Sequence, residues 1–453
     1  MSISLLTFRK VINRPAKIHI GTNCMTIRNN TLWSLAGSGL PLIAAAALIP
    51  FTLKILGNET FGVLTLVWVL IGYLSLFDMG VGRSLTYELS QLKAENKPHE
   101  IAQTLKAGVY LTLITGLVGA GAIWLLAPYL STWLKISPHI QADATSAFRL
   151  CALAVIPTTI TSGLRGGLEG LGDFAASNII KLIIGFSMFT MPTIVISLHG
   201  ASIAQITLYL SAVRVIVLLL AVWQLRRYLT QALGINITPS NIKQIFKYGV
   251  WVTVTGIVGP IMVYGDRFLV SNLLGAAELP FYAIPQEGLL RLLIIPAAFG
   301  AALMPLLSST KLGDLSTIYH TYFNKIAKLM LAVCTLSAVC AYPFLAVWLS
   351  PAFAQKAIVI VLILLVGVFL NGLSMVPYTL VQARGKPKLT ALYHLAELAI
   401  YVPLIWVLVS YLGLVGAALA WVVRVIIDFT LLQHTAKQLS KHHSQPISTL
   451  ANT

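Results

Sequence analysis

Residues 357–381 read AIVIVLILLVGVFLNGLSMVPYTLV and contain no Asp, Glu, Lys or Arg. A helix needs about 20 mainly apolar residues to cross the hydrocarbon core of a bilayer, so this segment predicts a transmembrane helix. The whole chain shares this character, because 57% of its 453 residues are hydrophobic, 10% are charged and the mean hydropathy is +0.84. Soluble proteins carry about 25% charged residues. The composition therefore predicts an integral membrane protein and excludes the soluble enzyme classes.

Apolar runs of similar length recur along the chain and predict an all-α membrane protein with twelve transmembrane helices. The predicted spans are residues 31–53, 61–82, 105–128, 143–164, 177–198, 203–224, 247–273, 282–308, 323–349, 357–381, 389–411 and 414–434. Prolines lie inside several of them, as at Pro157 and Pro403. A membrane bundle tolerates the bends that such prolines cause, whereas a soluble helix rarely does.

The distribution of basic residues among the predicted loops sets the orientation of the chain. With the N-terminus in the cytoplasm, all but three of the Lys and Arg residues outside the spans fall on the cytoplasmic side, and the exceptions are Lys54, Lys135 and Lys356. Short cytoplasmic loops of membrane proteins are rich in these residues. We therefore expect both termini to lie in the cytoplasm.

The two halves of the sequence resemble each other. The tetrapeptide VRVI at residues 213–216, in the sixth predicted span, recurs at residues 423–426 in the twelfth. A parallel repeat is common in transporters, although chance identity between apolar segments is the alternative. We predict two six-helix lobes in the same orientation. The predicted divisions are an N-terminal tail 1–30, an N-lobe 31–224, a cytoplasmic linker 225–246, a C-lobe 247–434 and a C-terminal tail 435–453.

Five arginines lie within the predicted spans, where a charge is costly. They are Arg149, Arg214, Arg267, Arg291 and Arg424. An arginine at a helix centre costs about 2.5–3.5 kcal/mol on insertion scales, so we expect these side chains to face the bundle interior or a watery cavity. Such a cavity would attract an anion of high charge density. A lipid-linked pyrophosphate fits, because the planar guanidinium matches phosphate oxygens.

Four acids also lie deep inside the predicted spans, away from the span ends. They are Asp266, Glu287, Glu397 and Asp428. Glu287 and Arg291 are four residues apart, as are Arg424 and Asp428, so each pair shares a helix face and can form an internal ion pair. Asp266 and Arg267 are adjacent, so their side chains diverge. Glu397 has no partner on its own helix and is our candidate for a carboxylate that titrates or binds a coupling cation. The alternative is that it pairs with a basic residue of a neighbouring helix.

Short motifs occur in a fixed order from about residue 28 to residue 435. They are Asn30-x2-Trp33-x3-Gly37-x3-Pro41, Leu56-Gly57-x-Glu59-x-Phe61-Gly62, Leu76-Phe77-Asp78-x-Gly80-x-Gly82-Arg83, Arg165-Gly166-x2-Glu169-Gly170, Asp266-Arg267-Phe268, Arg291-x3-Ile295-Pro296, Gln382-x2-Gly385-x-Pro387 and Gly413-x2-Gly416-Ala417-Ala418-x-Ala420-Trp421-x2-Arg424. Each motif is weak alone. Their order and spacing together resemble the polysaccharide-repeat (O-antigen) flippases of the multidrug/oligosaccharidyl-lipid/polysaccharide (MOP) exporter superfamily.

The resemblance implies two six-helix bundles around a central cavity, and a substrate that is an oligosaccharide repeat unit on undecaprenyl pyrophosphate. Such a flippase works in the bacterial inner membrane and moves its substrate to the periplasmic leaflet by alternating access, for O-antigen or capsule biosynthesis. The resemblance further implies coupling to an H⁺ or Na⁺ gradient, contact with membrane lipids, and polysaccharide polymerase and chain-length proteins as partners. No enzymatic reaction, cofactor, metal or nucleic acid is expected, and the chain has no GxxxxGK[ST] nucleotide-binding motif.

The expected site follows from placing this substrate in the cavity. The predicted pyrophosphate-binding residues are Arg214, Arg424, Arg291, Arg267 and Arg149. Arg214 and Arg424, at matching places in the two lobes, are expected to hold the pyrophosphate, and the other three to extend the positive field. Asp78 and Arg83, at the cytoplasmic end of the second span, are gate candidates, with a helix-terminal ion pair as the alternative.

Three other functions stay open. A multidrug/cation antiporter of the same superfamily would favour unpaired acids in its cavity, and here arginines outnumber acids within the spans only by five to four. A membrane-embedded polysaccharide polymerase needs an extended outer loop, and the longest predicted outer connection, residues 129–142, is too short to provide one. A lipid scramblase or channel is the third.

Overall fold

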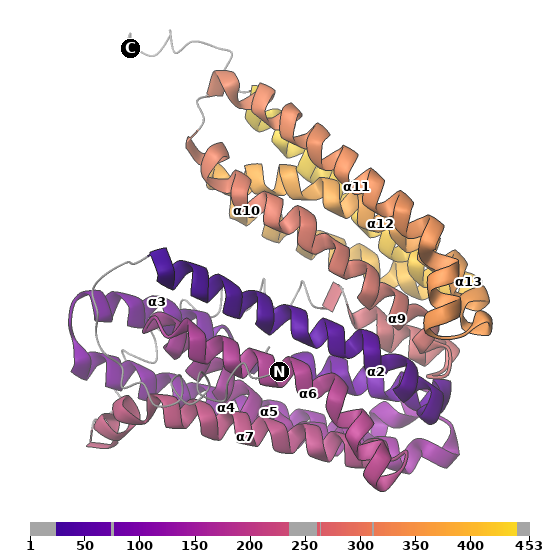
Figure 1. Cartoon of the computed structure of the whole chain (residues 1–453), viewed down its shortest axis with the longest axis horizontal. Coiled ribbons are helices and arrows are strands. Elements are labelled where there is room, and N and C mark those ends of the chain that lie inside the picture. Colours follow the sequence, from indigo (N-terminus) through magenta and orange to yellow (C-terminus); the bar gives the residue numbers. More distant parts are fainter. Residues whose placement is uncertain (1–23, 74–76, 235–260, 263, 310–311, 442–453) are drawn as a thin grey trace.

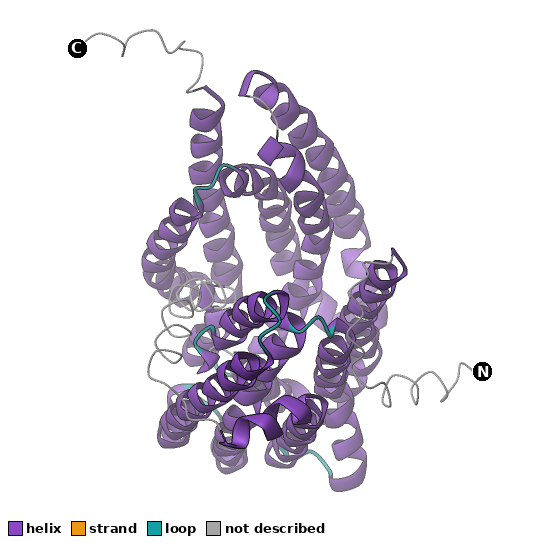
Figure 2. Ribbon diagram, turned by 90° about the vertical axis from the view of Figure 1, so that its left-hand side faces the viewer, coloured by secondary structure: helices purple, strands orange, loops and turns teal. Residues whose placement is uncertain are grey.

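The computed structural model describes residues 24–73, 77–234, 261–262, 264–309 and 312–441. All the elements in these ranges are helices, joined by short loops (Figure 2). This bears out the predicted all-α class. Figure 1 shows two groups of helices, one from α2 to α7 and one from α9 to α13, which meet near α9 and diverge toward their other ends.

The first two predicted spans lie within one element. Helix α2 (Cys24–Tyr73) is interrupted at Gly57, which adopts a left-handed φ of 72° and so breaks the helix into two arms. The second span was predicted to run on to residue 82, but α2 ends at Tyr73 and α3 (Val81–Ala94) begins a new helix. The backbone turns between them, because Met79 and Gly80 both have positive φ and the carboxylate of Asp78 accepts a hydrogen bond from the Gly80 amide.

Four long helices complete the first group. They are α4 (Pro98–Trp133), α5 (Pro138–Gly170), α6 (Phe174–His199) and α7 (Ile203–Gln231). Side chains cap two of their starts, since Asp173 accepts a hydrogen bond from the Ala176 amide and Ser202 accepts one from the Gln205 amide. Helix α7 continues past the predicted boundary at residue 224 and is followed by a short 3₁₀ turn, η2 (Ala232–Gly234). The rest of the predicted linker lies outside the described residues.

The second group begins with a helix of which residues 264–274 are described, so most of the predicted span 247–273 lies outside the described ranges. The predicted span 282–308 is broken into α9 (Leu279–Leu290), the 3₁₀ turn η3 (Arg291–Leu293) and α10 (Ile294–Ser309). The next two spans lie within α11 (Leu312–Trp348) and α12 (Pro351–Ala383).

Helix α13 (Pro387–Lys441) contains the last two predicted spans and folds back on itself at Gly413, whose φ of 59° and ψ of −138° are not helical. A Cβ atom on Gly416 would lie 1.9 Å from the carbonyl oxygen of Leu408, so the two arms touch directly after the turn. Further from the turn, Tyr393 and Thr435 share a 2.7 Å hydrogen bond between their hydroxyls. The two arms of α13 therefore form an antiparallel hairpin.

Eight of the described helices are long and apolar enough to cross a membrane. This confirms a multi-pass membrane protein. Two of the eight, α2 and α13, each hold two predicted spans, while α9 and α10 are each too short to be counted.

The two helix groups contact each other at the end predicted to face outward. A Cβ atom on Gly62 would lie 1.9 Å from the carbonyl oxygen of Ala276. The hydroxyl of Ser271 donates a 3.1 Å hydrogen bond to the carbonyl of Leu134, and Lys135 Nζ donates one to the carbonyl of Leu273 at 3.3 Å. A backbone carbonyl oxygen takes part in each of these three contacts, which allows the two groups to pack closely here.

Candidate functional site

Four ionisable side chains meet between the two arms of α13: His394, Glu397, Arg424 and Asp428, called here the α13 cluster. Nη1 of Arg424 is 3.6 Å from Oε2 of Glu397, and Nε2 of His394 is 3.9 Å from Oδ1 of Asp428. The Glu397 side chain is fully buried and that of Arg424 is 9% exposed. Arg424 therefore pairs across the hairpin with Glu397, and not along its own helix with Asp428 as the four-residue spacing allowed.

The α13 cluster is poor in hydrogen bonds. Nε of Arg424 is buried without a hydrogen-bond partner, and the buried carboxyl groups of Glu397 and Asp428 share a hydrogen bond with each other but with no other donor in the described part of the chain. The other neighbours of Arg424 are the sulfur of Met262 at 3.8 Å and the ring of Tyr401, whose centroid is 5.8 Å from the guanidinium carbon. Buried charged groups are normally well hydrogen-bonded, so this deficit marks a place where a further group can bind.

The spacing of the α13 cluster resembles that of a metal site, because ligand atoms of His394, Glu397 and Asp428 all lie within 4.8 Å of one another. The Arg424 guanidinium contacts the same carboxylate and opposes any bound cation. Hard cations also require about six or more oxygen ligands. A proton needs only one oxygen atom, so the arrangement suits a proton better than a metal ion.

A second polar network surrounds Asp266, on the helix 264–274. Its Oδ2 accepts hydrogen bonds from the Tyr282 hydroxyl at 2.6 Å, from Gln286 Nε2 at 2.8 Å and from the Tyr401 hydroxyl at 3.3 Å. Its Oδ1 is buried without a partner. Tyr401 also stands beside Arg424, so it connects this network to the α13 cluster.

Arg267 and Arg291 converge on one acid. Glu287 of α9 pairs with Arg267 at 2.9 Å through Oε2 and with Arg291 through Oε1. The pair of Glu287 and Arg291 has the predicted four-residue spacing. Arg267 forms no ion pair with Asp266 among the described residues, but its Nε donates a 3.3 Å hydrogen bond to Gln286, whose amide nitrogen donates one to Asp266. Arg267 is 5% exposed whereas Arg291 is 51% exposed, so Arg291 is the more accessible of the two guanidinium groups.

Arg214 lies on the buried face of α7 and is only 5% exposed. Leu210, one turn earlier, belongs to an apolar cluster that both helix groups share, and Val217, one turn later, belongs to a second cluster formed by α3 to α7. Within the described part of the chain Arg214 makes no hydrogen bond and no ion pair. Burying a guanidinium without a counter-charge costs free energy of desolvation, and this cost distinguishes Arg214 from the other polar groups of the first helix group.

Arg149, in the first half of α5, is exposed like Arg291. Its guanidinium carbon lies 5.7 Å from the ring centroid of Trp124 on α4. This cation–π contact is its only interaction among the described residues. The structure does not bring it next to Arg214, although both lie in the first helix group.

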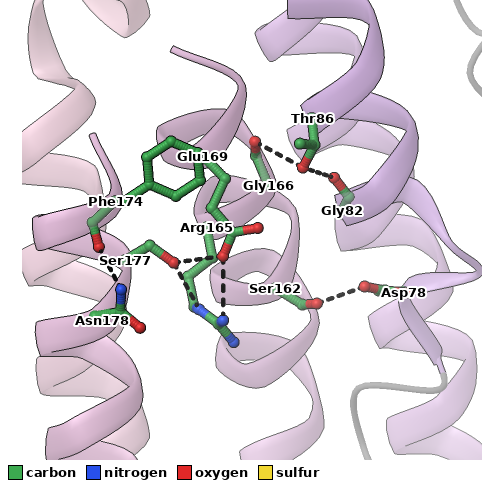
Figure 3. A network of polar contacts seen from close by, with 10 residues as sticks. All are labelled: Asp78, Gly82, Thr86, Ser162, Arg165, Gly166, Glu169, Phe174, Ser177 and Asn178. Atoms are coloured by element: carbon green, nitrogen blue, oxygen red, sulfur yellow. Dashed lines mark hydrogen bonds and ion pairs between the residues drawn. The ribbon is translucent and has the colours of Figure 1, made fainter. Parts of the chain in front are cut away.

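The gate candidates are not paired with each other. Asp78 accepts a hydrogen bond from the Ser162 hydroxyl of α5 (Figure 3), while Arg83 is exposed. No ion pair joins Asp78 and Arg83, both of which the structure describes. Asp78 therefore attaches the turn that precedes α3 to helix α5. The helix-terminal ion pair of Asp78 and Arg83, which was the alternative to a gate, is not formed. In the next turns of α5, Arg165 contacts Glu169 and Ser177 (Figure 3).

Several residues of these networks were missed by the sequence reasoning. Tyr401 is four residues after Glu397 and His394 is three residues before it, so both share its helix face. Gln286 is next to the predicted Glu287. Helical spacing around the predicted acids would have identified His394 and Tyr401. The contact of Asp266 with Tyr282 has no such signal, because it joins two different helices.

Comparison with known proteins places the chain in a family. Residues 27–311 match the family described as "Polysaccharide biosynthesis protein". A Shigella flexneri protein named "Putative O-antigen transporter" is 34% identical over 414 residues, which are 90% of this chain and 97% of that protein. The chain belongs to the polysaccharide biosynthesis protein family. The resemblance that the sequence motifs suggested is thereby confirmed.

Solved structures of similar fold are transporters of the MOP superfamily. A multidrug resistance MATE family transporter in an inward-facing conformation has a TM-score of 0.75 at 16% identity, covering 94% of this chain and 98% of that one. An outward-facing conformation of a transporter of the same family has a TM-score of 0.64 at 16% identity, covering 93% and 96%. This polysaccharide biosynthesis family member thus has the fold of the MOP transporters.

Proposed function

We propose that this protein is a flippase that moves an oligosaccharide repeat unit on undecaprenyl pyrophosphate from the cytoplasmic to the periplasmic leaflet. The fold is that of transporters, and the 34% identical relative is named as an O-antigen transporter. The role is transport rather than catalysis. The product enters O-antigen or capsule biosynthesis, where polysaccharide polymerase and chain-length proteins are the partners.

The observation that carries this proposal is the buried guanidinium of Arg214, which has no partner among the described residues. A buried charge persists only where a partner compensates its desolvation. A pyrophosphate group supplies such a partner, because its oxygens match the planar donors of arginine. Arg214 thus acts as the anchor of the N-lobe, and Arg424 of the C-lobe joins it when the two lobes enclose the headgroup.

The other arginines extend the positive field around this anchor. Arg291 is half-exposed and shares Glu287 with Arg267, so two positive charges face one negative charge. Arg149 adds a charge at the outer end, beside Trp124. Asp266, which is joined to Arg267 through Gln286, offsets one of these charges, so the half-exposed Arg291 and the buried Arg214 are the groups that favour an anion over a cation. Asp78, which accepts a hydrogen bond from Ser162, forms part of the cytoplasmic gate in this proposal. The exposed Arg83 is its second member.

The proposed architecture has twelve transmembrane helices in two six-helix lobes, residues 31–224 and 247–434, with both termini in the cytoplasm of a bacterium and the protein in its inner membrane. The two arms of α2 and of α13 count as separate helices in this scheme. The contacts of Gly62 with Ala276 and of Lys135 with Leu273 close the outer end. The greater likeness to an inward-facing transporter supports an inward-open state. Transport proceeds by alternating access, driven by an ion gradient through Glu397.

The test is deletion of the gene in its host followed by analysis of lipid-linked intermediates. Single repeat units that accumulate on undecaprenyl pyrophosphate in the cytoplasmic leaflet support the flippase. Repeat units that reach the outer leaflet but stay unpolymerised contradict it and indicate a polymerase. Complementation with Arg214→Ala then tests the anchor, and a normal amount of surface polysaccharide at native protein level would remove its role.

A multidrug/cation antiporter is the second candidate, because the α13 cluster holds two buried acids and the similar folds include multidrug transporters. Its substrate would pair with Glu397 and Asp428. Increased drug sensitivity of the deletion strain with unchanged surface polysaccharide would favour this function. Arg214, which has no partner among the described residues, and the half-exposed Arg291 argue for the anion instead.

A further inference from the structure

Pro50 leaves one backbone carbonyl of α2 without its helical partner. In an α-helix each amide donates to the carbonyl four residues earlier, and proline has no amide hydrogen, so the carbonyl of Ala46 receives no such bond. Ala46 belongs to the first arm of α2, before the break at Gly57. A carbonyl freed in this way inside a membrane needs a donor from elsewhere, because the hydrocarbon core holds no water to replace it.

A tryptophan of the other helix group supplies that donor. Nε1 of Trp348, the last residue of α11, donates a 2.6 Å hydrogen bond to the carbonyl of Ala46, 302 positions away in the sequence. The Trp348 ring also stacks on Phe344, one turn earlier in α11, with 5.3 Å between the ring centroids. Its own helix therefore orients the indole, and a single side chain bonds the two helix groups together.

This bond joins a different pair of helices from the contact of Gly62 with Ala276. Ala46 precedes the break at Gly57 and Gly62 follows it, so each arm of α2 makes its own contact with the second group. The contact of Gly62 is a close approach of backbones. The contact of Ala46 with Trp348 is a hydrogen bond, which is lost as soon as donor and acceptor separate.

The outer ends of the two groups cannot move apart without breaking this bond. While the groups are together, the Ala46 carbonyl has its donor, and when they separate it keeps only the water that enters the opening. The net contribution of one such bond corresponds to a factor of about two to ten in an equilibrium constant. An amide at residue 50 would satisfy the same carbonyl in both arrangements, so the factor exists because residue 50 is proline.

We propose that Pro50 and Trp348 form a latch that holds the outer end closed. The proline removes the donor within α2, and the tryptophan of α11 replaces it only while the two groups are in contact. A latch of one hydrogen bond favours the closed arrangement and still allows the groups to separate. It goes beyond the proposed function, because it concerns the equilibrium between closed and open outer ends and holds for any transported substrate.

The test measures outer opening of the full-length protein in lipid nanodiscs, without substrate, by double electron–electron resonance. Spin labels are attached to cysteines at Tyr129 and Tyr411, in a background without native cysteines, because both positions are exposed and belong to different helix groups. Trp348→Phe keeps an aromatic ring beside Phe344 and removes the N–H. The ratio of open to closed populations should rise about two- to tenfold. Trp406→Phe, at an exposed position of α13, is the matched control and should leave the ratio unchanged.

Pro50→Ala distinguishes the latch from simple packing of the Trp348 ring. It returns an amide that donates to the Ala46 carbonyl within the helix, so in this background Trp348→Phe should leave the ratio unchanged. Pro41→Ala, in the same arm of α2, controls for straightening of the helix, and the effect of Trp348→Phe should persist there. The difference between the two backgrounds isolates the coupling of Pro50 to Trp348.

Each outcome decides for or against the latch. A rise in Trp348→Phe that disappears with Pro50→Ala and persists with Pro41→Ala supports it. An unchanged ratio in Trp348→Phe, or an equal rise in the Pro50→Ala background, overturns it. If Trp348→Phe does not fold, benzothienylalanine at residue 348 gives the same comparison, because sulfur replaces only the indole N–H. None of these results bears on the flippase, which the lipid-linked intermediates of the deletion strain test separately.

Discussion

Gly62 and Ala276 belong to different helix groups, yet their backbones approach so closely that a Cβ atom on Gly62 would lie 1.9 Å from the Ala276 carbonyl oxygen. Moving either backbone away would separate the two groups at this end. The lack of a side chain at Gly62 is what permits the close approach.

Gly62→Ala is expected to open the outer end and to abolish transport while the helices still form. The measurement is labelling of a cysteine placed at Asn272, in a background without native cysteines, by a membrane-impermeant maleimide added from outside. Labelling should rise several-fold over the parent, because the added methyl group prevents closure. Gly121→Ala is the control, since a Cβ there meets nothing within 4 Å. Equal labelling in both variants would contradict an outer gate at Gly62.

Replacing Arg214 separates its transport role from its effect on stability. Arg214→Met is expected to abolish surface polysaccharide and to raise the melting temperature of the purified protein, because it removes an uncompensated buried charge at a gain of about 1–4 kcal/mol. Arg226→Met, at an exposed position beside Trp223, should change neither. A destabilised Arg214→Met protein would mean that the guanidinium has a partner in the resting state.

Arg424 calls for a charge-balanced experiment, since Arg424→Ala alone leaves Glu397 and Asp428 buried without a counter-charge. We expect that single variant to lose about 3–5 kcal/mol of stability. The double variant Arg424→Gln/Glu397→Gln should recover most of this loss and still fail to transport. Thermal unfolding in detergent and surface polysaccharide give the two readouts. Transport by the double variant at native protein level would exclude both residues from the mechanism.

Asp78 is expected to act on stability more than Arg83 does. Asp78→Ala removes the hydrogen bonds to Ser162 and to the Gly80 amide, which should cost about 1–3 kcal/mol. Ser162→Ala should reproduce part of this loss, and Arg83→Ala almost none. A larger loss of stability in Arg83→Ala than in Asp78→Ala would contradict the contacts described here.

The helical fold could be predicted because its signal is local and strong. A helix needs about 20 mainly apolar residues to cross a membrane, because the thickness of the bilayer sets that number, and runs such as residues 357–381 meet it within one stretch of sequence. The boundaries were less certain. The start of α3 at Val81 follows a turn in which Gly80 has a positive φ and donates its amide hydrogen bond to Asp78, and no average over a hydropathy window detects such a turn.

The candidate site was predictable only as a set of charged residues. The sequence located Glu397 and Arg424 within spans and left open whether Glu397 pairs across helices, which the structure answers with the contact to Arg424. The partner could not be chosen, because the hairpin at Gly413 decides which residues face each other. Likewise, no periodicity in the sequence connects Asp266 to Tyr282.

The hairpin of α13 has a consequence for how the protein is made. Glu397 and Arg424 lie on opposite arms of one continuous stretch of chain, so they meet as soon as that stretch folds back at Gly413. An arginine that enters the bilayer alone costs about 2.5–3.5 kcal/mol. When this segment enters as a folded hairpin, Glu397 neutralises the charge of Arg424, and no other helix has to supply the counter-charge during insertion.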